Sequence, residues 1–323
     1  MQQVLLYREL KYNKMKLKSV YTIILFCFTA LYANAQLRKN IDFNKEWKFY
    51  LGNDTAAIDE NFNDAAWRTL CLPHDWSIEG DFSKDHPATN QGGALPGGIG
   101  WYRKTFTLAE VDNEKKVAIE FDGVYRNSEV WINGHYLGKR PNGYISFSYD
   151  LTPYLKFGNQ KNVIAVKADN SQQPNSRWYS GSGIYRDVRL VVTKWWALKP
   201  EDVFVYCTTA NSREAVITAE TKLVTKNTDI GISADIYNAQ GKFIASMTPV
   251  KINEQHNFTF SYKISNPALW SVDNPALYKI RFRVFIAARQ MDEYETSFGI
   301  RSISFNKDKG FFLNNKPLKI KGV

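Results

Sequence analysis

Short stretches in which apolar and polar residues alternate recur along most of the chain. Clear examples lie at residues 117–121, 128–132 and 162–166. A period of two places every second side chain on one face, which is typical of half-buried β-strands. Asn133-Gly134 directly follows the second stretch and favours a type I′ hairpin turn, because glycine accepts a positive φ. Short strands separated by Gly, Asn and Pro, without long helical periodicity, predict antiparallel β-sandwiches.

Two successive series of strands predict two domains, so the expected fold class is all-β. The first series predicts a sandwich over residues 36–196. The second series, over 197–302, contains six or seven predicted strands and is closed by a strand over 296–305. Its size is that of an immunoglobulin-like sandwich, and the missing Cys…Trp…Cys pattern indicates the disulfide-free type.

Residues 1–35 have the order of an upstream start followed by a secretory signal peptide. A basic segment that begins at Met15 precedes an apolar run over 20–31, and Ala33-Asn34-Ala35 follows. The run of 12 residues is shorter than the roughly 20 needed to cross a bilayer, although a membrane anchor is the alternative. We expect cleavage before Gln36, a periplasmic or secreted location, and no membrane attachment after cleavage.

Composition and charge exclude several classes of protein. Aromatic residues at 15% and charged residues at 23% are incompatible with a disordered chain. The net charge of +10 is spread along the sequence rather than clustered, which argues against nucleic-acid binding. Three cysteines are too few for a disulfide scaffold and form no CxxC pair. The four histidines share no ligand spacing, so we expect no metal and no cofactor.

Several motifs carry a resemblance to a known family. They include Leu72-Pro73-His74-Asp75-Trp76, Gly98-Ile99-Gly100-Trp101-Tyr102-Arg103-Lys104, Phe298-Gly299-Ile300-Arg301 and the segment from Ser176 to Val188, which reads SRWYSGSGIYRDV. In this order they resemble the N-terminal half of glycoside hydrolase family 2, which contains β-galactosidases, β-glucuronidases and β-mannosidases. The last of these motifs is similar to the β-galactosidase branch. The resemblance covers about 40–323 and implies a jelly-roll (galactose-binding-like) sugar-binding sandwich followed by an immunoglobulin-like one.

The resemblance also implies where catalysis takes place. In this family two glutamates act from a (β/α)₈ barrel that follows the two sandwiches. One carboxylic acid protonates the leaving oxygen, and a carboxylate about 5–5.5 Å away attacks the anomeric carbon. Residues 303–323 resemble the lead-in to that barrel, with a predicted strand over 318–323. Both glutamates would lie beyond Val323, so we assign no catalytic residue and expect this chain alone to be inactive.

Three residues are candidates for binding a sugar. Arg177 and Trp178 lie in a Pro- and Gly-bounded loop, where a Trp ring can pack against a sugar and Arg can donate to hydroxyls or a carboxylate. The alternative is an Arg–Trp stack that packs against the barrel. Asn90 lies in a long irregular loop that is either a binding loop or a surface loop. Tyr144 is predicted to be a core residue, and Asp75 to accept backbone hydrogen bonds in a turn.

Two functional hypotheses follow. The chain is either the front part of an exported retaining β-glycosidase of the β-galactosidase type, truncated before its barrel, or a stand-alone carbohydrate-binding or adhesion protein. Carbohydrate is the expected partner in both cases. The first hypothesis adds the catalytic barrel as a partner in cis or in trans, and a homo-oligomer is possible. The apolar residues of the last predicted strand favour the first hypothesis, because they would remain uncovered if no barrel followed.

Overall fold

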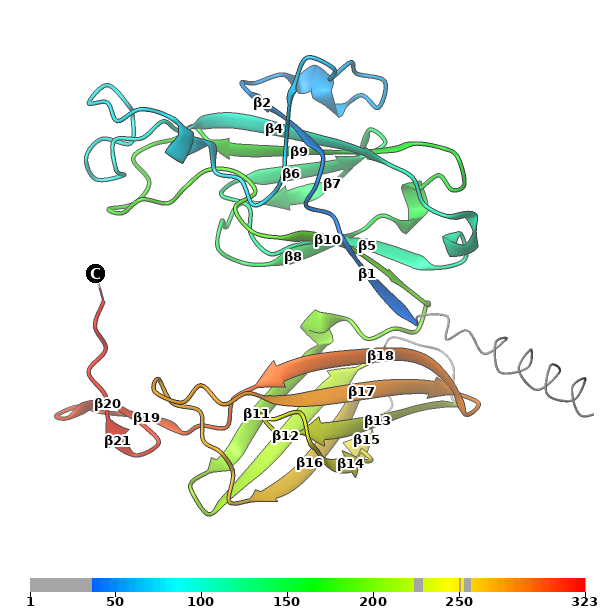
Figure 1. Ribbon diagram of the computed structural model, residues 1–323, viewed down its shortest axis with the longest axis vertical. Helices are drawn as coiled ribbons and strands as arrows, with labels where there is room; N and C mark the ends of the chain where they lie inside the picture. Colours follow the sequence, from blue (N-terminus) through cyan, green and yellow to red (C-terminus); the bar gives the residue numbers. More distant parts are fainter. Residues whose placement is uncertain (1–36, 224–228, 250, 253–256, 323) are drawn as a thin grey trace, which may run out of the picture. The chain divides into compact units, whose positions relative to one another are not determined.

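The computed structural model describes residues 37–223, 229–249, 251–252 and 257–322 (Figure 1). The predicted signal peptide lies outside these residues. No helix in the described part of the chain is long and apolar enough to cross a membrane. Apart from strands, its regular elements are short 3₁₀ helices: η1 (Thr55–Ile58), η2 (Trp76–Glu79), η3 (Glu110–Asp112), η4 (Thr152–Tyr154) and η5 (Pro200–Asp202).

The first sandwich consists of two antiparallel sheets. The larger sheet has the strand order β3-β2-β4-β9-β6-β7, and the smaller one has the order β1-β10-β5-β8. Their strands are β1 (Arg38–Asp42), β2 (Trp47–Leu51), β3 (Arg68–Leu70), β4 (Gly98–Phe106), β5 (Lys116–Phe121), β6 (Ser128–Ile132), β7 (His135–Arg140), β8 (Phe147–Asp150), β9 (Asn162–Asn170) and β10 (Val188–Thr193).

Alternation along the strands builds the core between these two sheets. Tyr102 and Ile164 of the larger sheet, with Ile119 and Phe121 of the smaller sheet, belong to one buried hydrophobic cluster. All four side chains are fully buried. Burial of each large apolar side chain contributes about 1.5–3 kcal/mol, so this cluster is the main source of stability for the sandwich.

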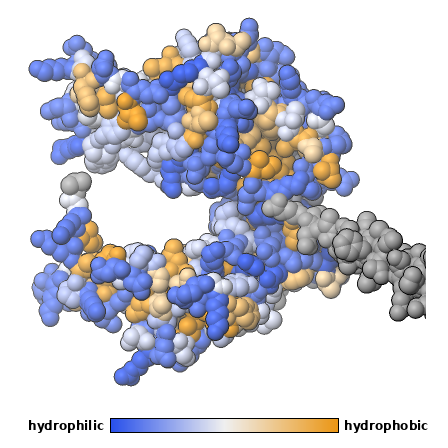
Figure 2. Space-filling model, in the orientation of Figure 1, coloured by the Kyte–Doolittle hydropathy of each residue, from blue (hydrophilic) through white to orange (hydrophobic). Residues whose placement is uncertain are grey.

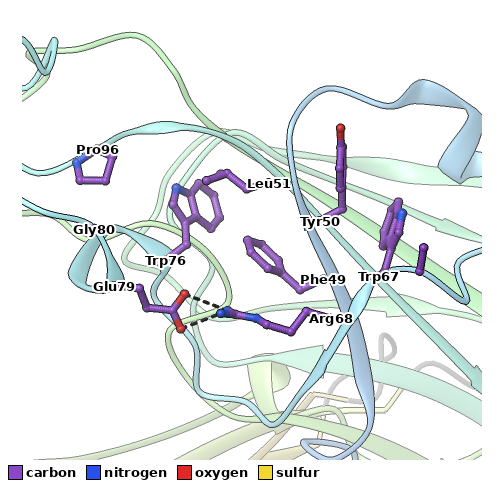
Figure 3. Close-up of a pocket in the computed structure, with 10 residues that line it drawn as sticks. Phe49, Tyr50, Leu51, Trp67, Arg68, Trp76, Glu79, Gly80 and Pro96 are labelled. Carbon is purple, nitrogen blue, oxygen red and sulfur yellow. Dashed lines mark hydrogen bonds and ion pairs between the residues drawn. The ribbon is translucent and has the colours of Figure 1, made fainter.

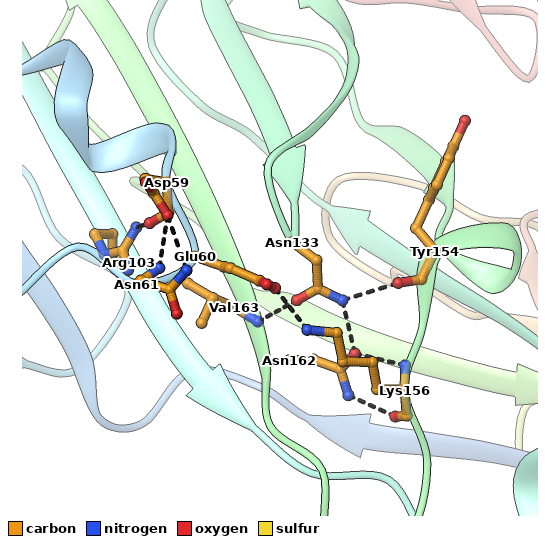
Figure 4. Close-up of polar contacts among 9 residues, drawn as sticks. All are labelled: Asp59, Glu60, Asn61, Arg103, Asn133, Tyr154, Lys156, Asn162 and Val163. Atoms are coloured by element: carbon orange, nitrogen blue, oxygen red, sulfur yellow. Dashed lines mark hydrogen bonds and ion pairs between the residues drawn. The ribbon is translucent and has the colours of Figure 1, made fainter.

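The outer face of the six-stranded sheet is covered by the segment that contains η1. Trp101 and Trp131 of this face stack with ring centroids 5.4 Å apart and pack against the covering segment. Arg103, only 1% exposed, points the same way. Its guanidinium contacts the Asp64 carboxylate at 2.8 Å and donates to carbonyl oxygens of the segment, including that of Asp59 at 3.0 Å (Figure 4). One buried cation therefore fixes the covering segment to the sheet.

The predicted hairpin at Asn133-Gly134 is confirmed. It joins β6 to β7, and both residues have positive φ angles, 49° and 79°. The Asn133 amide donates to the Tyr154 carbonyl at 2.8 Å and to Asn162 Oδ1 at 2.9 Å, and its own oxygen accepts from the Val163 N–H at 2.8 Å (Figure 4). The turn is thus tied to neighbouring chain segments by side-chain hydrogen bonds.

The second sandwich consists of two four-stranded antiparallel sheets, in the orders β11-β12-β16-β15 and β14-β13-β17-β18. Phe260 and Phe282 meet in its core with ring centroids 5.7 Å apart. This arrangement confirms the all-β class and the two-sandwich organisation. The strands are β11 (Val203–Ala210), β12 (Glu214–Lys222), β13 (Ile230–Tyr237), β14 (Phe243–Met247), β15 (Lys251–Ile252), β16 (Asn257–Ser265), β17 (Tyr278–Ile286) and β18 (Arg289–Phe298).

Two predictions about the C-terminal strands are wrong. The strand expected over 296–305 is divided, because β18 ends at Phe298 and β19 (Ile303–Asn306) begins a new sheet with β20 (Gly310–Leu313) and β21 (Lys316–Pro317). The strand expected over 318–323 is not formed in its described part, 318–322.

Figure 2 shows one face of the molecule, on which hydrophobic residues form separate groups among hydrophilic ones.

Candidate functional site

The segment between β9 and β10 carries the first two candidate residues. Trp178 is 61% exposed, and its indole N–H donates to the Tyr144 hydroxyl at 3.2 Å. Arg177 is also exposed, and its guanidinium forms no hydrogen bond or ion pair with any residue that the structure describes. Both side chains are therefore open to a ligand, and one is held by a neighbouring aromatic residue.

Tyr144 belongs to this surface rather than to the core, contrary to the prediction. It is 54% exposed and meets the edge of the Tyr125 ring at 5.3 Å between centroids. Tyr125 takes the inner position: its ring passes close to Gly143, where an added Cβ would lie 2.2 Å from the ring. We call Tyr144, Trp178 and Tyr179 the aromatic surface.

Asp75 holds the loop of the aromatic surface in place through hydrogen bonds to Tyr179 and Ser182. One carboxylate oxygen accepts from the backbone N–H of Ser77 at 3.0 Å and from that of Ser182 at 2.8 Å. The other oxygen accepts from the Tyr179 hydroxyl. Burial, together with the adjacent Asp75 carboxylate, raises the pKa of Tyr179, so its hydroxyl keeps its proton and remains a donor. The prediction that Asp75 accepts backbone hydrogen bonds is confirmed, and its contact with Tyr179 is additional.

A chain of hydrogen bonds runs from the buried Tyr102 through His74 to the half-exposed Arg68 and Glu79. His74 Nδ1 lies 2.7 Å from the Tyr102 hydroxyl, while its Nε2 faces Arg68 Nη2 at 2.8 Å and Glu79 Oε1 at 3.2 Å. Burial lowers the pKa of His74 and raises the pKa of Tyr102. Both groups are therefore neutral near pH 7, and they join the Leu72–Trp76 segment to β4.

The loop that contains Asn90 touches the aromatic surface through another residue. Gly93 lies against the Tyr179 ring, with the position of an added Cβ 3.4 Å from the ring carbon Cδ2. Asn90 is exposed, and its backbone oxygen accepts from the Gly93 N–H at 3.4 Å. The structure thus brings together the two loops that carry the predicted residues, although it gives the Asn90 amide no contact with Arg177 or Trp178 among the described hydrogen bonds.

The chemistry of this surface is that of recognition. The exposed indole ring is of a kind that can pack against a sugar, and the Arg177 guanidinium can donate to its hydroxyls. Asp75 is occupied by its own hydrogen bonds. Within the described residues, no group of three or more His, Cys, Asp or Glu side chains could hold a metal ion.

Comparison with known proteins identifies the chain. The family model "Glycosyl hydrolases family 2, sugar binding domain" matches residues 41–194, and the model "Glycosyl hydrolases family 2" matches 198–301. The chain belongs to glycosyl hydrolase family 2. This family 2 chain has the fold and the motifs that the sequence resemblance implied.

Relatives of this family 2 chain are considerably longer. It is 46% identical to a β-galactosidase of Bacteroides ovatus, over 88% of the chain and 34% of that relative. It is 33% identical to a β-glucuronidase of Formosa agariphila, over 88% of the chain and 32% of the relative. The crystal structure of a β-glycosidase from Bacteroides vulgatus superposes with a TM-score of 0.77 at 43% identity, covering 88% of this chain and 37% of that one. The chain therefore spans about a third of the length of these relatives.

Proposed function

We propose that this chain is the non-catalytic N-terminal part of an exported, retaining β-glycosidase of the β-galactosidase type, which acts on terminal β-glycosidic bonds of oligo- or polysaccharides. The observation that carries the proposal is the 46% identity with a β-galactosidase over 88% of the chain. The identity with glucuronidases of Formosa agariphila is lower, at 38% for a putative β-glucuronidase and 33% for a β-glucuronidase. Galactoside is therefore the preferred substrate class.

In this proposal the aromatic surface takes part in substrate binding. The exposed ring of Trp178 packs against the apolar face of a sugar, and Arg177 donates to its hydroxyls. Their loop is fixed by Asp75, so little conformational entropy is lost when the sugar binds. The acid and the nucleophile belong to a barrel domain and not to these sandwiches, so the 323-residue chain binds sugar without hydrolysing it.

Three measurements test the proposal. The intact mass of the protein from its native source should lie well above the 37.2 kDa of these residues, and a mass near that of residues 36–323 would contradict the glycosidase assignment. The N-terminal sequence of the exported fraction should begin at Gln36.

An NMR assay of the longer native form with 4-nitrophenyl β-galactoside should show the β-anomer of galactose as the first product, whereas the α-anomer would exclude retention.

Substrate preference and the role of the aromatic surface need their own comparison. The native form should hydrolyse 4-nitrophenyl β-galactoside faster than the corresponding β-glucuronide, and the 323-residue chain should hydrolyse neither. In the native form, Trp178→Ala should raise KM for a galacto-oligosaccharide while Trp195→Ala, at another exposed tryptophan, should not. Equal effects of the two substitutions would remove Trp178 from the substrate site.

A further inference from the structure

A groove lies at the edge of the six-stranded sheet, apart from the aromatic surface. Strand β3 is only three residues long and pairs with Trp47–Phe49, so Tyr50 and Leu51 extend past its end. The cavity beside them has a volume of about 450 Å³ (Figure 3). This lies within the range of about 300–1,000 Å³ that is common for small-molecule sites. None of the three residues of the aromatic surface lines the groove.

The walls of the groove are held in place by contacts of their own. The Tyr50 ring stacks on Trp67 with centroids 5.4 Å apart. On the opposite side, the Trp76 indole N–H donates to the Gly97 carbonyl at 3.1 Å. Pro96 packs so closely on Gly80 that an added Cβ would lie 2.5 Å from its ring. The groove is therefore preformed, which lowers the entropic cost of binding.

The groove combines apolar surface with one ion pair, Arg68–Glu79, which has no net charge. Tyr50 is 42% exposed and Leu51 50% exposed, so both offer apolar area to a ligand. Arg68 Nη2 contacts the two Glu79 carboxylate oxygens at 3.0 and 2.8 Å (Figure 3). The hydrogen bonds of Arg68 to described residues use Nη2 alone, so its other N–H groups remain available as donors. The carboxylate supplies acceptors beside them.

These features match the chemistry of an uncharged sugar. A pyranose has an apolar C–H face that packs on an aromatic ring, and neighbouring hydroxyls that both donate and accept. A charged ligand would gain little, because Arg68 and Glu79 already neutralise each other. We propose that this groove is a second carbohydrate site, which binds a neutral β-linked oligosaccharide. It goes beyond the proposed function, because the site needs no catalytic barrel.

The test is an NMR titration of the full chain, labelled with ¹⁵N, with β-1,4-galactotetraose. The indole N–H signals of Trp67 and Trp76, which line the groove, should shift on titration. Tyr50→Ala should weaken the binding followed by these signals about five- to tenfold, as expected for loss of an aromatic contact. Tyr50→Phe, which keeps the ring, should bind almost as well as the unmodified chain.

Two controls separate the groove from the aromatic surface. Trp178→Ala should leave the Trp67 and Trp76 shifts unchanged, and glucuronate should not reproduce them. If Tyr50→Ala does not fold, Leu51→Asp provides a second variant, because its side chain is half exposed and a charge there would oppose binding. The proposal is overturned if the tetrasaccharide shifts neither signal up to roughly 10 mM, if glucuronate shifts them equally, or if folded Tyr50→Ala or Leu51→Asp binds unchanged.

Discussion

Replacing Arg103 with methionine tests whether one buried cation holds the covering segment on the sheet. Methionine keeps an unbranched side chain but removes the ion pair with Asp64 and the hydrogen bonds to the carbonyls of Asp59 and Phe62. Breaking a buried pair by removal of one partner costs about 3–5 kcal/mol. In a domain of this size that corresponds to a fall in Tm of roughly 6–20 °C. Arg103→Lys should lose less, because it keeps the charge without the planar fork.

Tryptophan fluorescence during urea unfolding is the appropriate assay. Eight of the nine tryptophans precede residue 197, so the signal reports mainly on the first sandwich. The control is Arg189→Met, because the Arg189 guanidinium pairs with Glu120 and Asp122 at a partly exposed position. Its expected effect is about 0–1 kcal/mol. Equal losses of unfolding free energy in the two variants, or a loss below about 1 kcal/mol for Arg103→Met, would refute the reasoning.

Three further predictions concern the support of the aromatic surface. Burial lowers the pKa of His74, so protonation favours the unfolded state and stability should fall as pH drops below about 6.5; a stability advantage over His74→Gln that does not shrink between pH 7.5 and 5 would contradict this. Asp75→Ala should cost about 1–3 kcal/mol and speed amide hydrogen exchange within 176–183, and unchanged exchange there would show that Asp75 does not fix the loop. Gly183→Ala should lower Tm more than Gly241→Ala. Both glycines have a positive φ, but only at 183 would the added methyl meet a hydroxyl at 2.3 Å and a backbone oxygen at 2.9 Å. Calorimetry compares the two variants, and equal losses of Tm would show that the close contacts at Gly183 add nothing to the cost of the positive φ.

Local patterns in the sequence were sufficient for most strands and turns. The alternation in β5 reflects burial on the core face, and the Asn133-Gly134 pair by itself predicts its turn. Strand β9 is instead buried on both faces over 162–166, because Ala165 lies under the covering segment. The continuous strand expected over 296–305 fails for a tertiary reason. Trp270 packs on Gly299, and its backbone N–H donates to the Ile300 carbonyl at 2.8 Å. Residues 299–300 therefore contact a distant segment instead of extending β18.

The candidate site was predictable in its loops but not in its supports. The exposed positions of Arg177 and Trp178 agree with a loop bounded by Pro and Gly. The contact of Asp75 with Ser182 joins residues 107 positions apart, and no periodicity encodes such a pair. Tyr144 was predicted to lie in the core, but it packs on the Tyr125 ring and stays 54% exposed. This contact joins two separate segments, so the residues next to Tyr144 do not predict it.

The clamped hairpin at Asn133-Gly134 has a consequence for the chemical ageing of the protein. An Asn–Gly pair in a flexible chain deamidates readily, because the next backbone nitrogen can attack the side-chain amide carbon. Here the Asn133 amide must first break its hydrogen bonds to the Tyr154 carbonyl, Asn162 Oδ1 and the Val163 N–H. Conversion to aspartate would also set a carboxylate against two oxygens that now accept from the amide. Deamidation at this turn therefore requires local opening, and the shelf life of the covalent chain is linked to the stability of the fold.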